Sequence, residues 1–232
     1  WETLPVKSPR ALLVLPRDLV VVRKLDLPTV PDNELPDLVR LQAATKLATP
    51  VDRLALDYLP LATTPESLGR SVLLVSADQE RLQGIVAAAR QAGLEPVGAV
   101  TSTISVAELA LRCIDSSSGL ILIAWQHRRR LELFALYERV PIFSYSLTLP
   151  EGDAAGRSQL LRAELSRVQV AVRQAQHDAD VSRVLVIQEG EQDESVLSVL
   201  RDRFGELVHP LDAADLRRGA GGGAALPPDV SA

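Results

Sequence analysis

The residues in this sequence that could do chemistry are few, and the densest group of them is basic. His127, Arg128, Arg129 and Arg130 stand next to one another between two apolar stretches. Several guanidinium groups at one turn create a local positive field, which could hold a phosphate group or an anionic membrane surface. The alternative is favoured, because the tip of a β-hairpin is normally polar whatever its function.

An acidic run, EGEQDE at residues 189–194, is the second charged cluster. Its carboxylates could hold calcium, but they lack the alternating ligand spacing of an EF-hand loop. Acidic residues also stabilise the start of a helix through the helix dipole. A solvated loop ahead of a helix is therefore the favoured interpretation.

Side chains that could act as nucleophiles or metal ligands show no suitable spacing. The histidines are His127, His177 and His209, and neither their spacing to one another nor that to Cys113 matches a metal site. Ser116–Ser118 lack a G-x-S-x-G elbow and an S-x-x-K partner. Cys113 stands beside Leu111 and Ile114 and is expected to fill the core. Since a P-loop and a dinucleotide fingerprint are also missing, we expect no enzyme and no metal.

Composition and charge exclude further classes. The net charge is −5, so nucleic-acid binding is not expected. No apolar run approaches the roughly 18 residues of a membrane span, and a single cysteine excludes an internal disulfide framework. The chain begins at Trp1 and contains no methionine, so we expect a fragment with a natural N-terminal segment before it.

Hydrophobic patterns predict an α/β fold. Expected strands cover 11–15, 19–27, 52–61, 70–77, 95–100, 119–126, 131–137, 140–148, 183–188 and 206–209. Expected helices cover 33–47, 79–92, 102–114, 153–178 and 193–204. Asp32 or Asn33 is expected to cap the first helix and Asp78 the second, and Gly93 is placed to end the second.

The order of the elements predicts a topology for the second half of the chain. From residue 119 on, three strands joined by tight turns are followed by helix, strand and helix. This is the order of one ribonuclease-H-like unit, which actin-type folds duplicate. The glycine-rich and proline-rich tail is expected to be mobile.

Three stretches of the sequence carry a resemblance to one family. They are LPRDLVVVRKLDLPTVPDNELPDLVRLQA at 15–43, VDRLALDYLPL at 51–61 with its Asp57-Tyr58 pair, and VLLVSADQERLQGIVAAARQAGLEPVGAV at 72–100. In pattern and in order they resemble the type IV pilus assembly protein PilM family. The resemblance is looser in the second half of the chain.

This resemblance implies an actin-like ATPase fold of the FtsA type. An inserted small subdomain would cover residues 10–77, and the remainder of the first actin-like subdomain would cover 78–118. A second ribonuclease-H-like subdomain would cover 119–215, and a flexible tail 216–232.

The resemblance also implies a function. PilM and the related cytoplasmic domain of GspL are cytoplasmic scaffolds of type IV pilus and type II secretion assembly. A chain similar to them would lie at the inner membrane and bind the cytoplasmic tail of a PilN-like protein. The assembly ATPase is a further partner under this reading, and a homodimer stays open.

Polar residues in the matched stretches are the candidates for partner binding. They are Arg23, Arg40, Asp57 and Tyr58. The alternative for Asp57 and Tyr58 is that they only hold the end of a strand in place.

Departures from the family pattern concern the nucleotide. The second phosphate loop of the family resembles D-I-G-x-x-x-T, but Ile123 stands at the place of its aspartate and Trp125 at the place of its glycine. Only Gly190 remains of the glycine-rich adenosine loop. An indole excludes the close backbone approach that a phosphate needs, so no cofactor is expected. The alternative is an ATP-binding and magnesium-binding actin-like protein whose first phosphate loop lies upstream of Trp1.

Overall fold

The chain divides into two compact units. The computed structural model describes residues 9–61, 69–114, 119–175, 180–189 and 193–212. Unit 1 takes in Trp1–Ser105 and Val140–Ser146, and unit 2 takes in Val106–Arg139 and Leu147–Ala232. Ser116–Ser118, His177, Gly190 and the tail 216–232 lie outside the described residues. The expected subdomain boundaries at 77, 118 and 215 stay predictions.

A three-stranded antiparallel sheet with one helix forms the larger part of unit 1. Its strands are β2 (Val20–Leu27), β3 (Leu54–Pro60) and β4 (Arg70–Asp78), in the order β2-β4-β3. Helix α1 (Leu35–Lys46) contributes Leu35, Val39 and Ala43 to a core shared with β2 and β4. Leu25 and Leu27 of β2 and Val72 and Leu74 of β4 belong to this core, two residues apart in each strand, because side chains alternate between the faces of a sheet.

A parallel strand pair and a helix complete the regular elements of the first hundred residues. Strand β1 (Arg10–Leu15) pairs with β5 (Glu95–Thr101), and α2 (Gln79–Gln91) precedes β5. The Asp78 carboxylate accepts a hydrogen bond from the Arg81 backbone N–H at 2.9 Å, and Gly93 has φ of +81° after the helix. Both predicted ends of this helix are confirmed.

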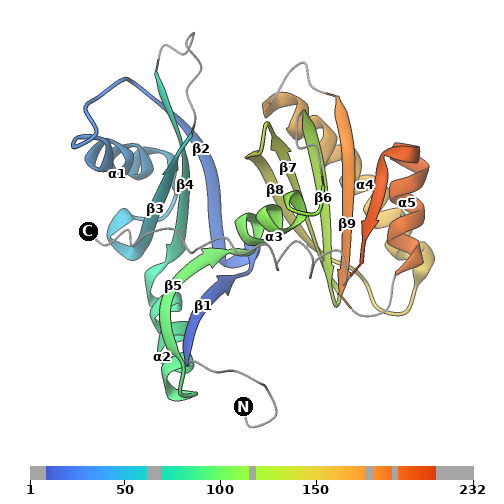
Figure 1. The fold of residues 1–232 in the computed structure, drawn as a ribbon, viewed down its shortest axis with the longest axis horizontal. Helices are drawn as coiled ribbons and strands as arrows, with labels where there is room; N and C mark the ends of the chain where they lie inside the picture. Colours follow the sequence, from blue (N-terminus) through green and yellow to red (C-terminus); the bar gives the residue numbers. More distant parts are fainter. Residues whose placement is uncertain (1–8, 62–68, 115–118, 176–179, 190–192, 213–232) are drawn as a thin grey trace. The chain divides into compact units, whose positions relative to one another are not determined.

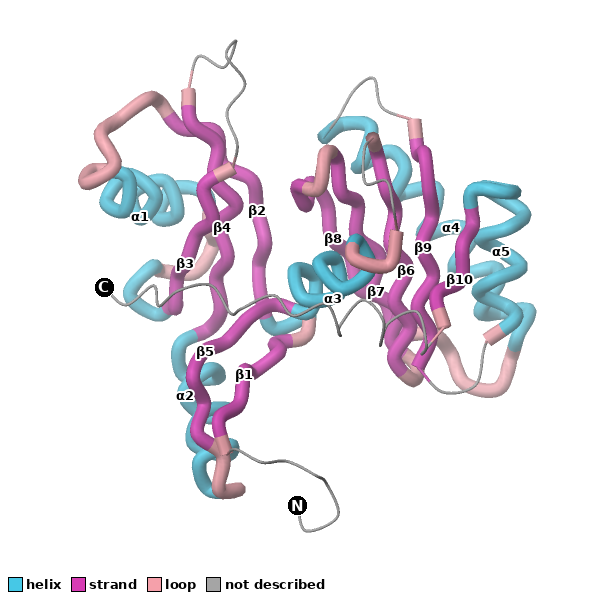
Figure 2. The backbone as a smooth tube through the Cα atoms, in the orientation of Figure 1, coloured by secondary structure: helices cyan, strands magenta, loops and turns pink. Residues whose placement is uncertain are grey.

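A five-stranded mixed sheet follows. Its strands are β6 (Leu120–His127), β7 (Arg130–Tyr137), β8 (Val140–Thr148), β9 (Val181–Glu189) and β10 (Val208–Leu211). Their order is β10-β9-β6-β7-β8 (Figure 2). Strand β6 is antiparallel to β7 and parallel to β9. In chain order this reads 5-4-1-2-3, the ribonuclease-H-like topology predicted from the sequence.

Helices cover the five-stranded sheet. They are α3 (Ser102–Leu111), α4 (Ala154–Ala175) and α5 (Glu194–Phe204). Helix α3 packs through Ala107, Ala110 and Leu111 on the face that carries Ile121 and Ile123. Leu120 and Leu122, which alternate with them along β6, lie beside residues of α4 and Phe204 of α5. Figure 1 shows α3, α4 and α5 around this sheet. Short 3₁₀ helices are η1 (Arg17–Leu19), η2 (Val51–Arg53) and η3 (Gly205–Leu207).

Two local predictions were wrong. Neither Asp32 nor Asn33 caps α1, since the N-cap position is Glu34, whose side chain makes no capping hydrogen bond. The Asp32 carboxylate instead pairs with Arg70 at 2.5 Å. Helix α3 ends at Leu111 rather than at residue 114, and Cys113 lies half-buried in the following turn with its Sγ donating to the Leu109 carbonyl oxygen at 3.3 Å.

None of the helices in the described part is long and apolar enough to cross a membrane.

Candidate functional site

The hairpin turn between β6 and β7 lies at the end of the five-stranded sheet where β6 and the parallel strand β9 finish. This end is called the sheet edge below. His127 pairs with Arg130, so Arg128 and Arg129 form a two-residue turn. Arg128 has φ of +54°, in the left-handed region that such hairpin turns require. The basic cluster therefore lies at a hairpin tip, as the favoured interpretation predicted.

Alternation along β6 separates its last residues onto two faces. Ile123 is completely buried in the core on the α3 face, and Trp125 packs against the same cluster. The Trp125 ring lies 6.0 Å from the His127 ring, centroid to centroid. Gln126 points to the opposite face, which is the face that α4 and α5 cover.

A hydrogen-bonded network fills this edge of the sheet. Gln188 on β9 stands beside Gln126 in the parallel register and donates its Nε2 to the Gln126 Oε1 at 2.7 Å. The Gln126 Nε2 donates in turn to the Asp193 Oδ2 at 3.4 Å and to the Arg128 carbonyl oxygen at 3.3 Å. Gln126 is 8% exposed, so its amide needs these partners.

Asp193 is the centre of the network. Its carboxylate caps α5 by accepting from the Ser195 backbone N–H at 3.0 Å and from the Ser195 hydroxyl. The Arg157 guanidinium of α4 lies 3.2 Å from the same carboxylate and 3.3 Å from the Ser195 Oγ. Burial acts to raise the pKa of Asp193, but hydrogen bonds from Ser195 and Gln126 and the charge of Arg157 outweigh it, so the pKa lies below its ordinary value.

This lowered pKa predicts a pH dependence of stability. A carboxyl group whose folded pKa lies below the unfolded value of about 3.9 stabilises the fold above that pH, and the effect is lost as the pH falls through the folded pKa. In Asp193→Asn the cap is kept but the charge is removed. The difference in free energy of unfolding between the natural chain and this variant should therefore shrink below about pH 4. Denaturant titrations across the acid range measure it, and a difference that stays constant would contradict the assignment.

A polar hollow of ≈ 490 Å³ opens at this edge. Its charged lining residues are Arg128, Arg129, Arg157, Glu151, Asp193 and Glu194. The numbers of cationic and anionic side chains are equal, and Arg129 donates to the Leu149 carbonyl oxygen at 3.2 Å and to Glu151. The charged lining therefore has no net positive charge with which to attract an anion.

The residues present at this edge do not fit the magnesium and nucleotide that the fold class implies. A helix N-terminus attracts phosphate through its free N–H groups, but at α5 the carboxylate of Asp193 occupies that position with the same sign of charge. Ile123 lies in the core on the other face and carries no oxygen ligand. Within the described residues, no group of three histidine, cysteine or acidic side chains could hold a metal ion.

The four predicted partner-binding residues lie in unit 1, and the structure does not bring them all together. Arg23 and Tyr58 stand opposite Leu74 in the sheet register, so both are on the face that α1 covers. Asp57 is on the opposite face, and its Oδ1 accepts from the Tyr58 backbone N–H at 2.8 Å. Arg40 is exposed on α1.

Arg23 has a local structural role that can be measured. Its Nη1 donates to the Lys46 carbonyl oxygen at 2.8 Å, at the C-terminal end of α1. A cation at a helix C-terminus stabilises it modestly, so Arg23→Ala should lower the free energy of unfolding by about 0.5 kcal/mol. Arg40→Ala is the matched control and should change it by less. Thermal denaturation of both variants tests this, and equal effects would contradict a capping role.

Three residues of the network at the sheet edge, Gln126, Gln188 and Arg157, were not predicted from the sequence. A signal for two of them was present. Apolar runs in β6 and β9 both end in glutamine, in LILIAWQ and VLVIQ, and parallel strands place their carboxyl ends at the same edge. No signal in the sequence pointed to Arg157.

No protein-family model matches the sequence, and no curated protein does. A chain of a PilM–PilN type IV pilus biogenesis complex matches in structure, with a TM-score of 0.69 and 19% identity over 91% of this chain and 71% of that one.

Two further structures are similar. The cytoplasmic domain of EpsL, an inner membrane component of the type II secretion system of Vibrio cholerae, matches with a TM-score of 0.56 and 10% identity, over 91% of this chain and 74% of that one. A Bacteroides thetaiotaomicron protein with an actin-like ATPase fold and unknown function matches with a TM-score of 0.47 and 10% identity, over 90% and 72%.

The strand order and the two stronger likenesses lead to one conclusion about architecture. The fold is actin-like. The α/β fold class predicted from the sequence is therefore confirmed, and identities below 20% carry the likeness no further than the fold.

Proposed function

We propose that this chain is a non-catalytic scaffold of a type IV pilus or type II secretion assembly, located in the cytoplasm at the inner membrane. The observation that carries the proposal is the likeness to a chain of a PilM–PilN complex over 91% of this chain. The EpsL domain, from an inner-membrane component, supports the same class of role. Its first partner would be the cytoplasmic tail of a PilN-like inner-membrane protein.

The hydrogen-bonded network around Asp193 at the sheet edge supports a role that needs no nucleotide. Arg157, Asp193 and Gln126 satisfy one another there, so a phosphate would have to displace an existing ion pair. Phosphoryl transfer depends on a positioned metal and positioned charge, and Ile123 supplies neither. A scaffold needs only a stable surface for its partner, and the network around Asp193 is compatible with such a surface.

The partner surface is proposed on the three-stranded sheet and α1. Arg23 and Tyr58 lie on the same face of the sheet, on either side of Leu74, and provide a cation and an aromatic ring. Arginine and tyrosine are over-represented among residues that dominate binding energy at protein interfaces. Asp57 and Arg40 lie on other faces and would make separate contacts.

Titration with a tail peptide tests partner binding. A fluorescent peptide with the sequence of the cytoplasmic tail of the PilN-like protein from the same organism is added to the chain, and anisotropy is followed. Saturable binding is expected, weakened about tenfold or more in Tyr58→Ala. Gln159→Ala, at an exposed site in unit 2, is the control. Absence of saturable binding in the natural chain would overturn the scaffold proposal.

A second titration tests the alternative of an ATP-binding protein. Magnesium and ATP are added to the longest natural form of the protein, and the melting temperature is measured. No saturable rise is expected, whereas a ligand at a hundred times its Kd would stabilise the fold by about 2.7 kcal/mol. A clear rise would contradict the nucleotide-independent role.

Size-exclusion chromatography with light scattering, with and without the assembly ATPase, tests the two remaining partners, that ATPase and a second copy.

A further inference from the structure

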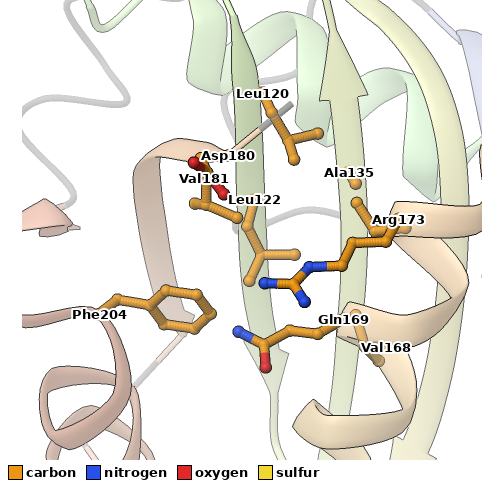
Figure 3. A pocket seen from close by; sticks show the side chains of 10 residues that line it. Leu120, Leu122, Ala135, Val168, Gln169, Arg173, Asp180, Val181 and Phe204 are labelled. Atoms are coloured by element: carbon orange, nitrogen blue, oxygen red, sulfur yellow. The ribbon is translucent and has the colours of Figure 1, made fainter. Parts of the chain in front are cut away.

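Unit 2 contains an apolar hollow of ≈ 190 Å³ between the five-stranded sheet, α4 and the end of α5 (Figure 3). Its lining includes Arg173 and Asp180, whose opposite charges select neither an anionic nor a cationic ligand. Small-molecule pockets usually measure about 300–1,000 Å³, so the hollow is also small. Apolar surface that is open to solvent lies instead in unit 1, on β1 and β5.

Strands β1 and β5 form a two-stranded parallel sheet with little burial (Figure 2). Within the described part of the chain, no further strand pairs with either of them. Only Leu15 and Thr101, the last residues of the two strands, are buried. Parallel sheets are normally covered on both faces and have more strands, so this pair has surface left to bury.

Large apolar side chains are exposed on this pair. Leu12 is 49% exposed, Val14 51% and Val97 45%. Leu12 and Val14 are two residues apart in β1, so their side chains lie on the same face. Single exposed apolar residues are normal, but neighbouring ones on a strand with an unpaired edge are typical of a surface that pairs with another strand.

The two free strand edges of this sheet differ in what they offer another strand. The Glu95 backbone N–H donates to the Pro9 carbonyl oxygen at 2.7 Å, so the backbone groups of Glu95 point toward β1. Those of its neighbour Pro96 must point to the free edge of β5, where proline has no N–H to donate. On β1, the same alternation turns the backbone groups of Leu12 and Val14 to the free edge. The edge of β1 is therefore open, and that of β5 is blocked.

We propose that a second copy of this chain pairs antiparallel with the free edge of β1, which joins the two β1–β5 pairs into one continuous sheet. A two-fold dimer brings the same surface of both copies together, so this edge must be complementary to itself. With Leu13 on the two-fold axis, Leu12 stands opposite Val14 of the partner subunit and exchanges backbone hydrogen bonds with it. A register centred on Leu12 would instead place the charged Arg10 opposite Val14.

Self-complementarity carries the choice of a second copy, since in this register each exposed apolar side chain of β1 meets an apolar neighbour. The proposal goes beyond the function proposed above and does not depend on it. The free edge lies on β1, whereas the proposed surface for a PilN-like tail lies on the three-stranded sheet and α1. Dimerisation and tail binding can therefore fail separately.

Charge-exchange variants test the dimer and its register. Leu12→Lys and Val14→Glu should each weaken dimerisation about tenfold or more, because two-fold symmetry places each change in the interface twice. Mixing the two variants should restore the dimer, since the introduced lysine then faces the introduced glutamate. Leu41→Lys, at an exposed leucine of α1, is the matched control and should leave dimerisation unchanged. Light scattering over a concentration series of the full chain measures all of them.

A cysteine on the two-fold axis gives a second readout. In a Cys113→Ser background, Leu13→Cys should form an intermolecular disulfide under mild oxidation, because directly opposite residues of antiparallel strands lie within disulfide range. Val97→Cys, at an exposed site on β5, is the control and should not. Rapid cross-linking through Leu12→Cys in place of Leu13→Cys would contradict the proposed register.

Hydrogen exchange shows what covers the edge. In the dimer, protection of the Leu12 and Val14 amides should rise with chain concentration. Protection in a monomer, either of this chain or of the longest natural form of the protein, would assign the edge to a segment of the same chain and overturn the proposal. Protection that requires the PilN-like tail peptide would assign it to that partner and overturn it as well. So would a chain that stays monomeric at every concentration, or mixed variants that fail to dimerise.

Discussion

Replacing Phe134 with alanine is expected to lower the free energy of unfolding by about 3 to 5 kcal/mol. Phe134 is completely buried in the middle of β7. It stands directly opposite Ile123 and belongs to the cluster formed with α3 and β9. A cavity in the centre of this cluster cannot close without moving strands on both sides, so little of the lost energy is recovered.

Denaturant titration measures the Phe134→Ala effect. Phe204→Ala is the matched control, because Phe204 is only partly buried at the edge of an existing hollow and should cost less. An effect of Phe134→Ala below about 1 kcal/mol would contradict the prediction and would mean that the cluster relaxes around the cavity.

The elements were predictable because the strands and helices carry strong patterns. The apolar run LILIAW of β6 is buried on both faces and reads as a central strand, as parallel and mixed sheets require. Asp78 and Gly93 enclose α2 with the residues that its ends need. Once three strands in succession were followed by helix, strand and helix, few topologies remained.

Side-chain placement was less predictable, although one part of it follows from the strand period. Asp57 and Tyr58 are adjacent in β3, so they must point to opposite faces and cannot serve one surface. Asp32 does not cap α1, and its carboxylate instead accepts a hydrogen bond from the distant Arg70. That contact spans 38 residues and leaves no local signal.

The hydrogen-bonded network at the sheet edge was even harder to predict from the sequence. Gln126 and Gln188 are 62 residues apart and meet only because β6 and β9 pair in one register. A shift of one of these strands by one residue would turn its glutamine to the opposite face. The difference from the PilM pattern at Ile123 and Trp125 was visible in the sequence, but the hydrogen bonds among Gln126, Gln188 and Asp193 were not.

Asp193→Ala is the second large effect and is expected to lower the free energy of unfolding by about 2 kcal/mol. Loss of an aspartate cap costs about 1 kcal/mol. A further loss of about 1 kcal/mol is expected because the side chains of Arg157 and Gln126 lose a hydrogen-bond or ion-pair partner in a partly enclosed site. Asp193→Asn keeps an acceptor at the cap and should lose about half as much.

A double-mutant cycle separates the cap from the ion pair. If Arg157 acts mainly through Asp193, the double variant with Arg157→Ala should be destabilised by less than the sum of the single variants. Exact additivity would mean that the 3.2 Å ion pair contributes nothing to stability and that Asp193 acts on α5 alone.

The same variant tests why this edge does not fit a nucleotide. In Asp193→Ala the N–H groups at the start of α5 and the guanidinium of Arg157 both become free for an anion. Inorganic phosphate should then raise the melting temperature of Asp193→Ala more than that of the natural chain, with sodium chloride at equal ionic strength as the control. If phosphate has no such effect, the carboxylate of Asp193 does not stand where an anion would bind.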